Sequence, residues 1–386
     1  MKAIVYSKYG PPAVVALAEV PKPSPKEHEV LIRIHATTVT TGDWRARSLS
    51  LPRGFGLLGR LVFGVFGPRK PVLGTELAGE VEAVGSAVTR FKVGDPVFAF
   101  TGASYGCHAE YRTMAEDGLI AVKPSNLSFE EAATLSFGGT TALSFLRDKA
   151  GIQRGDSVLV VGASGGVGTA AVQLAKHFGA TVTGVCSTAN VDLVRSIGAD
   201  RVIDYTTEDF GRDRDAYDII LDTTGTASFS RCENALKEGG RLLVVLGSLA
   251  QALGMDRPPR ASGKKVISSV AVPDVDDMQL LARLAATGEL RPVIDRSYPL
   301  ENAAQAHAYV DTGRKRGSVV LSIVPARARA RVAERAHPMV VAASPCRRAC
   351  SSQADGAGIL AHASRSLEVA TQRHAEQTRL ARRNAG

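Results

Sequence analysis

The chain has 386 residues, of which 45% are hydrophobic and 22% are charged, and this composition is typical of a globular enzyme with about two domains. No stretch reaches the roughly 18 consecutive apolar residues of a membrane-spanning helix, and the first residues lack the apolar core of a signal peptide. Residues 325–386 contain 11 Arg and 4 acidic residues, whereas residues 1–324 contain 36 basic and 34 acidic residues. A nearly neutral body with a basic tail argues against a nucleic-acid-binding protein.

The five cysteines are too few and too scattered for a disulfide scaffold, and an odd number is typical of a reducing compartment. Because the sequence also shows neither a membrane span nor a signal peptide, we expect a cytoplasmic protein.

The first part of the chain predicts a mainly β unit. Runs of β-branched and alternating residues at 3–6, 29–35, 77–84 and 96–100 are separated by turn-forming Pro and Gly. Long stretches with helical spacing are scarce here, so we expect a sheet with few helices.

From about residue 124 the pattern changes to alternating helices and strands. Ser128, followed three residues later by Glu131, predicts a capped helix start. Apolar strands are predicted at 157–161, 180–185, 201–203, 217–222 and 241–246. Such uninterrupted apolar strands, alternating with helices, indicate a parallel sheet that is covered on both faces. A strand at 317–324 follows. We expect the Ala- and Arg-rich residues 325–386 to be disordered or marginally helical, and the alternative is a functional basic arm for an acidic partner.

The sharpest motif directly follows the strand at 157–161 and opens a helix. It consists of Gly162, Ala163, Ser164, Gly165, Gly166, Val167 and Gly168. Glycines at such a turn let the backbone approach a pyrophosphate, and the helix start offers free N–H groups and a positive dipole. The motif therefore predicts a dinucleotide site, and the alternative interpretation is a tight strand–helix turn without a ligand.

The end of the next strand bears on the choice between NAD and NADP. Folds that prefer NAD place an acidic residue there, against the ribose hydroxyls. This chain has Cys186 and Ser187 instead, so no carboxylate opposes a 2′-phosphate. We therefore predict NADP(H) as the cofactor. Ser187, Thr188 and Tyr205 can donate hydrogen bonds to the phosphate, although no Lys or Arg lies in the loop itself.

Further motifs support a family resemblance over residues 1–324. They include Leu-Gly-Thr-Glu-Leu-Ala-Gly-Glu-Val at 73–81, Phe-Lys-Val-Gly-Asp-Pro-Val at 91–97, Gly-Gly-Thr-Thr-Ala-Leu at 138–143 and Asp-Thr-Thr-Gly at 222–225. With the glycine segment, they resemble the medium-chain dehydrogenase/reductase superfamily, and specifically its zinc-free quinone oxidoreductase branch.

The resemblance implies an α/β fold in which a doubly wound, parallel Rossmann sheet is inserted into a mainly β, GroES-like catalytic domain. The expected boundaries are 1–123 for the first part of the catalytic domain, 124–265 for the NADP(H)-binding domain and 266–324 for the return to the catalytic domain. The resemblance also implies a homodimer.

The residues at the family's zinc positions predict that this chain holds no metal. By resemblance, Thr40 stands where zinc alcohol dehydrogenases of the superfamily have their first Cys, and Thr75 stands where they have His. Residues 131–142, the region of the third ligand, contain neither Cys nor His, and Cys107 alone falls near the structural zinc lobe. A catalytic zinc requires three protein ligands, so we expect NADP(H) without zinc.

Without a Lewis acid, hydride delivery from NADPH to an electrophilic carbon is the easier reaction. We therefore predict the reduction of a small hydrophobic quinone or α,β-unsaturated carbonyl. Thr40 is the candidate hydrogen-bond donor to the substrate oxygen, and Tyr105 is a candidate acid. By resemblance, Thr141 lies beneath the nicotinamide, and Gly247 and Ser248 lie beside its ribose.

Two alternatives remain open, one from another class of function and one a rival enzyme. One is a non-catalytic NADPH-binding protein, and the other is the enoyl reductase of lipid or polyketide synthesis.

Residues 51–71 form a Gly-rich, apolar insertion relative to the family. We predict that this segment lines or covers the substrate site through Phe55, Leu57, Phe63 and Phe66, with Trp44 at the rim of the pocket. The alternatives are an oligomer contact and a packed surface loop.

Overall fold

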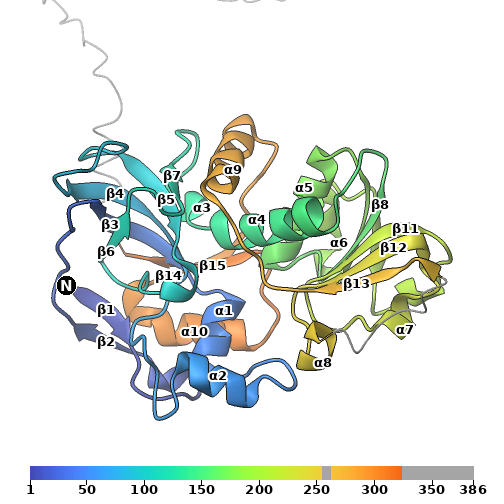
Figure 1. Ribbon diagram of the computed structural model, residues 1–386, viewed down its shortest axis with the longest axis horizontal. Coiled ribbons are helices and arrows are strands. Elements are labelled where there is room, and N and C mark those ends of the chain that lie inside the picture. Colours follow the sequence, from blue (N-terminus) through green and yellow to red (C-terminus); the bar gives the residue numbers. More distant parts are fainter. Residues whose placement is uncertain (254–261, 324–386) are drawn as a thin grey trace, which may run out of the picture. The chain divides into compact units, whose positions relative to one another are not determined.

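The computed structural model describes residues 1–253 and 262–323, and its elements are labelled in Figure 1. The predicted disordered tail, residues 325–386, lies outside these ranges. The described strands and helices are β1 (Lys2–Val5), β2 (Ala16–Glu19), β3 (Glu29–Thr38), α1 (Thr41–Ser48), α2 (Gly56–Phe63), β4 (Glu76–Val84), β5 (Pro96–Phe100), β6 (Tyr111–Ala115), β7 (Ile120–Val122), α3 (Phe129–Ala132), α4 (Ser136–Leu143), β8 (Ser157–Val161), α5 (Gly166–His177), β9 (Thr181–Cys186), α6 (Val191–Ser196), β10 (Arg201–Asp204), β11 (Tyr217–Asp222), α7 (Phe229–Cys232), β12 (Leu236–Val244), α8 (Leu249–Ala252), β13 (Lys265–Ser268), α9 (Val275–Thr287), β14 (Ile294–Pro299), α10 (Ala303–Asp311) and β15 (Ser318–Ser322).

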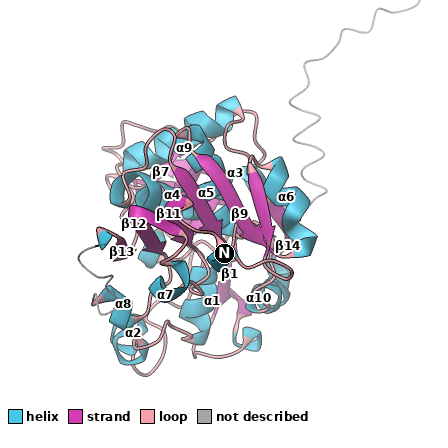
Figure 2. Cartoon of the chain, turned by 90° about the vertical axis from the view of Figure 1, so that its right-hand side faces the viewer, coloured by secondary structure: helices cyan, strands magenta, loops and turns pink. Residues whose placement is uncertain are grey.

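A six-stranded parallel sheet has the order β10-β9-β8-β11-β12-β13, and its strands are seen in Figure 2. The chain runs outward from β8 through β9 to β10, then returns to β11 on the other side of β8. This reversal makes β8 and β11 the switch point of a doubly wound fold, where ligands bind at the carboxyl ends of the strands.

Both faces of this sheet are buried, as the uninterrupted apolar strands predict. Val158 and Val160 pack into a core that α4, α5 and α9 share, whereas Leu159 and Val161 pack into a second core with α7. All four valine and leucine side chains are less than a tenth exposed. Alternation along a single strand thus places apolar groups on both faces, which requires helices on each.

A second sheet joins the two ends of the described chain. Its order is β14-β15-β3-β4-β5-β7, and β6 also pairs with β3. β15 runs antiparallel to β3, so a strand that follows the parallel sheet completes a sheet that begins before it. This arrangement confirms the predicted fold class, a doubly wound parallel sheet inserted in a mainly β unit.

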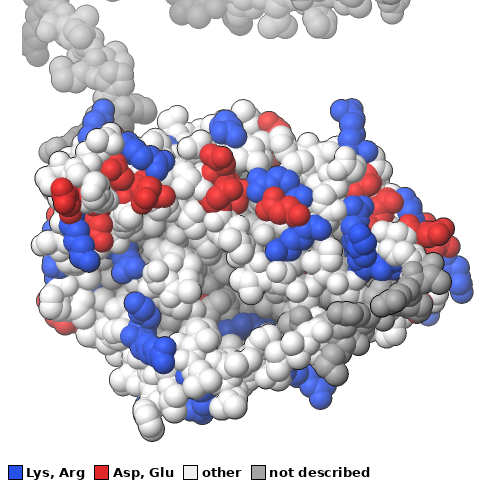
Figure 3. Space-filling view, viewed as in Figure 1, with Lys and Arg blue, Asp and Glu red and all other residues white. Residues whose placement is uncertain are grey.

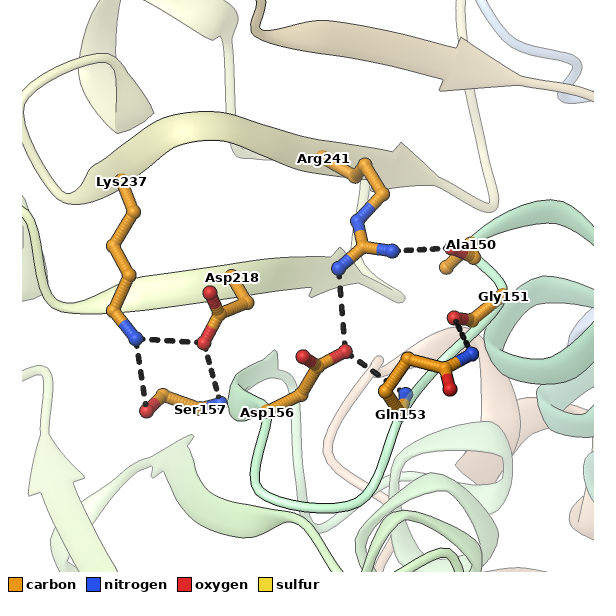
Figure 4. Close-up of polar contacts among 8 residues, drawn as sticks. All are labelled: Ala150, Gly151, Gln153, Asp156, Ser157, Asp218, Lys237 and Arg241. Atoms are coloured by element: carbon orange, nitrogen blue, oxygen red, sulfur yellow. Dashed lines mark hydrogen bonds and ion pairs between the residues drawn. The ribbon is translucent and has the colours of Figure 1, made fainter.

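The amino ends of the parallel strands carry a network of charges, drawn in Figure 4. Lys237 Nζ lies 2.7 Å from Asp218 Oδ2, and Arg241 lies 3.2 Å from Asp156 Oδ2. The Asp218 carboxylate also accepts the Ser157 N–H at 2.8 Å, which ties the start of β8 to β11. These contacts hold the amino ends of the strands together. Ligands bind at the opposite, carboxyl ends, where the glycine turn lies.

No helix in the described ranges is both long and apolar enough to cross a lipid bilayer.

Candidate cofactor and substrate site

The glycine turn between β8 and α5 has a backbone that side chains would disrupt. Gly162 has a φ of +80°, a conformation that L side chains rarely adopt. Gly168 packs so closely that a Cβ atom there would lie 2.1 Å from the Gly162 carbonyl oxygen. Ala163 is fully buried and faces β9, where its Cβ lies 3.0 Å from the point that a Cβ on Gly184 would occupy. The turn therefore needs small residues for its own geometry.

The start of α5 is open for an anion. Gly165 is the N-cap residue, and no side-chain hydrogen bond caps the helix. The N–H groups of the first turn, at Gly166, Val167 and Gly168, thus point out of an uncapped helix that carries a positive partial charge. A Cβ on Gly165 would meet only the Gly162 carbonyl oxygen, at 3.5 Å. This open, uncapped start suits the pyrophosphate of a dinucleotide.

Lys315 adds a cation at the same helix start, and sequence reasoning missed it. Its Nζ lies 3.2 Å from the point that a Cβ on Gly166 would occupy, and it donates to the Gly317 carbonyl at 2.6 Å. The neighbouring backbone is fixed because the Gly317 N–H donates to the Ser164 carbonyl at 2.7 Å. Burial lowers the pKa of Lys315 to about 8, although Glu76 and Asp295 act to raise it.

Lys315 follows a Gly-Arg pair near the end of the described chain, where the sequence carries no signal of a cofactor contact. Only the three-dimensional structure shows which Lys or Arg side chain lies near the glycine turn.

The predicted adenosine-side residues gather at the carboxyl ends of β9 and β10. Asn190 donates to the hydroxyl oxygens of Ser164 at 3.1 Å and Ser187 at 3.2 Å. The Thr188 hydroxyl lies 3.0 Å from that of Thr206. Tyr205, directly after β10, is 60% exposed and available to a ligand.

Asp204 is a carboxylate that sequence reasoning overlooked at this end of the sheet. It is the register partner of Cys186, the position of the acid in NAD-preferring folds. Hydrogen bonds from Thr188 and Thr206 lower the pKa of Asp204. The Asp204 Oδ1 accepts both the hydroxyl and the N–H of Thr206, at 2.8 and 3.0 Å. The Asp204 carboxylate is therefore already hydrogen-bonded to residues of its own loop.

The residues predicted to lie near the nicotinamide are on α4 and at the start of α8. A Cβ on Gly138 would lie 2.4 Å from the Gly166 carbonyl oxygen, so α4 packs directly on the start of α5. Thr141, next along α4, is 8% exposed and donates its hydroxyl to the Phe137 carbonyl at 2.7 Å. Ser248 caps α8, and Gly247 leaves no room for a side chain because a Cβ would lie 2.0 Å from Ser268 Oγ.

Glu76 connects β4 to α4 and is 1% exposed. Its carboxylate accepts the Phe137 N–H at 2.6 Å and the hydroxyls of Ser136 at 2.8 Å and Thr38 at 2.5 Å. A carboxylate at the start of a helix stabilises it through the helix dipole. Burial nevertheless raises the pKa of Glu76 to about 7, against the lowering effect of these hydrogen bonds.

Thr40 and Asp43 form the start of α1. The Thr40 hydroxyl accepts the Asp43 N–H at 3.1 Å and donates to Asp43 Oδ2 at 2.6 Å. Asp43 is fully buried, and its other oxygen accepts the Gly74 N–H at 2.8 Å. Asp43 is thus a structural residue that also orients Thr40.

Tyr105 lies in a strained backbone conformation, with a φ of +51°. Such strain at a non-glycine residue persists only where the surroundings impose it, and it is common at functional sites. The ring is 8% exposed, and its centroid lies 6.5 Å from that of Phe63. Burial and the charge of Asp43 raise the pKa of the Tyr105 phenol.

The structure divides the predicted substrate-pocket residues into two groups. Trp44 and Phe63 are half-buried and pack against the same cluster as Tyr105. Phe55 is half-buried at the start of α2, whereas Phe66 is fully exposed beyond its end. Trp44 and Phe63 therefore share the surroundings of Tyr105, and Phe66 does not.

Zinc does not fit the side chains at the positions that the family resemblance indicates. Thr40 and Thr75 offer hydroxyls, and both oxygens of Glu76 accept hydrogen bonds from protein donors. Burial raises the pKa of the Cys107 thiol to about 12. Within residues 1–253 and 262–323, no cluster of three or more His, Cys, Asp or Glu side chains could hold a metal ion. No catalytic step through zinc follows from these residues.

Comparisons with known proteins show which family this chain resembles. Residues 26–124 match the family "Alcohol dehydrogenase GroES-like domain", and residues 197–321 match the family "Zinc-binding dehydrogenase". The chain is 36% identical over 337 residues to a "2-methylene-furan-3-one reductase" of Solanum lycopersicum, covering 84% of this chain and 80% of that protein.

A second relative and a solved structure show the same likeness. The chain is 33% identical over 337 residues to an "NADPH-dependent alkenal/one oxidoreductase, chloroplastic" of Arabidopsis thaliana, covering 84% of this chain and 80% of that protein. It matches the structure of the quinone oxidoreductase from Coxiella burnetii with a TM-score of 0.74 and 30% identity, covering 84% of this chain and 99% of that one.

Proposed function

The chain belongs to the medium-chain dehydrogenase/reductase superfamily, in its quinone oxidoreductase-like branch, and we propose that it transfers a hydride from NADPH to a quinone or an α,β-unsaturated carbonyl without zinc. The observation that carries this proposal is the uncapped start of α5 behind a turn that excludes side chains. The names of the relatives, which act on enones and quinones, support the same class of substrate.

The preference for NADPH over NADH rests on the carboxyl ends of β9 and β10. No acid follows β9, and Asp204 is engaged by Thr188 and Thr206. Ser187 and the exposed Tyr205 remain to contact a 2′-phosphate. We expect a lower Kd for NADPH than for NADH in a fluorescence titration, and equal values would contradict this preference.

When bound, NADPH supplies the hydride, and the protein positions the acceptor and its oxygen. Thr40 directs its hydroxyl proton at Asp43, so donation to a substrate oxygen requires an exchange of that hydrogen bond. Tyr105 has a raised pKa, so its phenol keeps the proton at neutral pH and acts as a donor. α4 packs on the start of α5 through Gly138, and Thr141 lies about one turn further along α4, where the nicotinamide end of the cofactor would lie.

Residues 51–71 reach the loop that carries Gly247 and Ser248. The Leu249 N–H donates to the Arg53 carbonyl at 2.9 Å, and a Cβ on Gly54 would lie 2.6 Å from that of Leu249. This contact supports a lid that covers the substrate through Phe55 and Phe63.

Lys315 provides a test of the cofactor position with a pH signature. Lys315→Met removes a cation from the pyrophosphate site, and we expect roughly tenfold weaker NADPH binding at pH 7. Because the pKa of Lys315 is about 8, its ammonium loses the proton as pH rises through that value, so affinity of the unchanged protein should fall there.

The arginine variant is the matched control for this pH effect. Lys315→Arg keeps its charge at high pH, so its NADPH affinity should fall less above pH 8. A fluorescence titration across pH measures all three proteins. If NADPH affinity changed with pH identically in the unchanged protein and in Lys315→Met, Lys315 would not contact the cofactor.

The proposed reaction is tested by NADPH oxidation, followed at its absorbance, with quinones, enones and an enoyl thioester. We expect turnover with quinones or enones, and metal analysis should show no stoichiometric zinc. NADPH binding without any turnover would favour the non-catalytic alternative, and turnover confined to the enoyl thioester would favour the enoyl reductase. One zinc per chain would overturn zinc independence.

A further inference from the structure

Helix α2 turns its apolar side chains outward, unlike an ordinary surface helix. The buried residue of α2 is Gly59. Leu51 packs so closely against it that a Cβ on Gly59 would lie 1.8 Å from Leu51 Cδ1. The side chains that face solvent on α2 and in the loop after it are Leu57 (76% exposed), Leu58 (46%), Leu61 (53%), Val62 (66%), Val65 (45%) and Phe66 (104%). Such a contiguous exposed apolar patch marks an interaction surface.

The sequence around this helix carries cations and no acids. Between Asp43 and Glu76 the sequence contains no acidic residue. Four exposed basic residues flank the apolar side chains, and they are Arg53, Arg60, Arg69 and Lys70. None of the four forms an ion pair with a residue that the structure describes. Figure 3 shows the surface over α2, at the lower edge of the view, as white atoms with blue among them and without red.

A hollow of about 630 Å³ lies beside α2. Leu57 and Arg60 of the helix line it together with Tyr9 and Leu49. The hollow therefore brings the Arg60 guanidinium near the Leu49 and Leu57 side chains, which suits a phosphate group attached to a hydrocarbon chain.

From these observations we propose that the α2 surface, defined as residues 53–70, binds the face of an anionic lipid bilayer. Exposed Leu, Val and Phe side chains enter the boundary between headgroups and acyl chains, as in interfacial amphipathic helices. Each nearby Lys or Arg contributes about 1 kcal/mol of attraction to an anionic surface. The helix lies on the membrane and does not cross it. This binding can be measured without NADPH or substrate, and it would place the protein where hydrophobic quinones and enones dissolve.

The positive charge of the α2 surface favours an anionic bilayer over two other binding partners. A second copy of the chain docked on the same surface by a two-fold axis would bring like charges together. Residues 325–386, with a net positive charge, would also be repelled by Arg53, Arg60, Arg69 and Lys70. An anionic bilayer supplies both the apolar phase and the opposite charge.

The test is co-sedimentation of the full chain with vesicles, without NADPH or substrate. We expect binding to vesicles of phosphatidylcholine with phosphatidylglycerol, and much weaker binding to phosphatidylcholine alone. The double variant Val62→Ser with Phe66→Ser removes exposed apolar groups that hold no core, and it should bind the anionic vesicles on the order of tenfold more weakly. Arg69→Glu with Lys70→Glu should lower binding to the anionic vesicles similarly.

Matched controls change the same residue types elsewhere. Val122 is 55% exposed on β7, and Arg283 is exposed on α9, so Val122→Ser and Arg283→Glu should bind like the unchanged protein. Melting temperatures of all variants should agree within a few degrees, because the altered side chains are exposed.

A spectroscopic readout places the insertion at α2 itself. In the variant Phe66→Trp, fluorescence should shift to the blue and be quenched by brominated lipid, beyond the change that Trp44 shows in the unchanged protein. Equal vesicle binding by the Val62→Ser, Phe66→Ser variant would show that another part of the chain carries the binding, and it would overturn the proposal. A failure of the unchanged protein to bind, or a change of oligomeric state in the double variant without lipid, would overturn it too.

Discussion

We expect Gly165→Val to weaken NADPH binding by on the order of a hundredfold while the melting temperature stays nearly unchanged. Gly165 has φ −81° and ψ 174°, an extended conformation that valine adopts without strain. Its Cβ would make an ordinary contact of 3.5 Å with the Gly162 oxygen. The branched side chain would cover the N–H groups of the first turn, and the loss of about 3 kcal/mol of charge-assisted hydrogen bonding corresponds to that fold-change.

Gly168→Ala is the matched comparison because its main effect should be on stability and not on NADPH affinity. Its Cβ would lie 2.1 Å from the Gly162 carbonyl oxygen, so β8 and α5 must separate, at a cost of about 1 to 3 kcal/mol in the free energy of unfolding. We expect a lower melting temperature for Gly168→Ala. Fluorescence titration with NADPH and thermal unfolding of both variants measure the contrast. Unchanged NADPH affinity in Gly165→Val would mean that the glycine turn is not the cofactor site.

The glycine turn could be predicted from the sequence because its geometry is local. The strand before it, the helix after it and the glycines between them are consecutive in the chain, and each obeys short-range rules of backbone conformation. The parallel sheet could be predicted for a similar reason, since strands such as 157–161 and 217–222 contain uninterrupted apolar runs, Val158–Val161 and Ile219–Leu221. Both expectations agree with β8 and β11.

Residues that act through distant contacts could not be found in this way. Lys315 reaches the start of α5 because the segment before β15 pairs with Ser164 and Gly165, and no local pattern announces that pairing. Asp204 lies beside Cys186 through the register of two parallel strands. In both cases the chemistry depends on which segments become neighbours.

The orientation of α2 was also beyond sequence reasoning. Residues 55–66 are apolar nearly all round, so no polar face marks the solvent side. The structure turns Phe55, Gly59 and Phe63 inward at a spacing of four residues. The small Gly59 lets Leu51 approach the helix. Phe66, beyond the end of α2, lies in solvent instead of in the predicted pocket.

We expect the free energy of unfolding to fall as pH rises because of Glu76, and we expect Glu76→Gln to remove this part of the pH dependence. The pKa of this carboxyl is 4.5 as a reference and about 7 in the folded protein. Between these values the folded state holds a proton that the unfolded state has released. Stability from this group is therefore full below about pH 4.5 and is lost as pH rises through about 7, and the shift corresponds to about 3 kcal/mol.

The amide variant should keep the contacts of the carboxyl group without its charge. In Glu76→Gln, the side-chain carbonyl oxygen can accept from the Phe137 N–H and the Ser136 hydroxyl, and the Thr38 hydroxyl can turn to accept from the amide. The difference in unfolding free energy between Glu76→Gln and the unchanged protein should therefore shift by about 3 kcal/mol in favour of the variant from pH 5 to pH 8.

Denaturant unfolding at several pH values measures this difference, and groups that titrate equally in both proteins cancel. Glu238→Gln, which changes an exposed glutamate, should show a difference that is nearly flat with pH. A flat difference for Glu76→Gln would mean that Glu76 has the same pKa in the folded and unfolded states. The donors Thr38, Ser136 and Phe137 would then offset its burial completely, and the start of α4 would rest on an ionised carboxylate at every pH of activity.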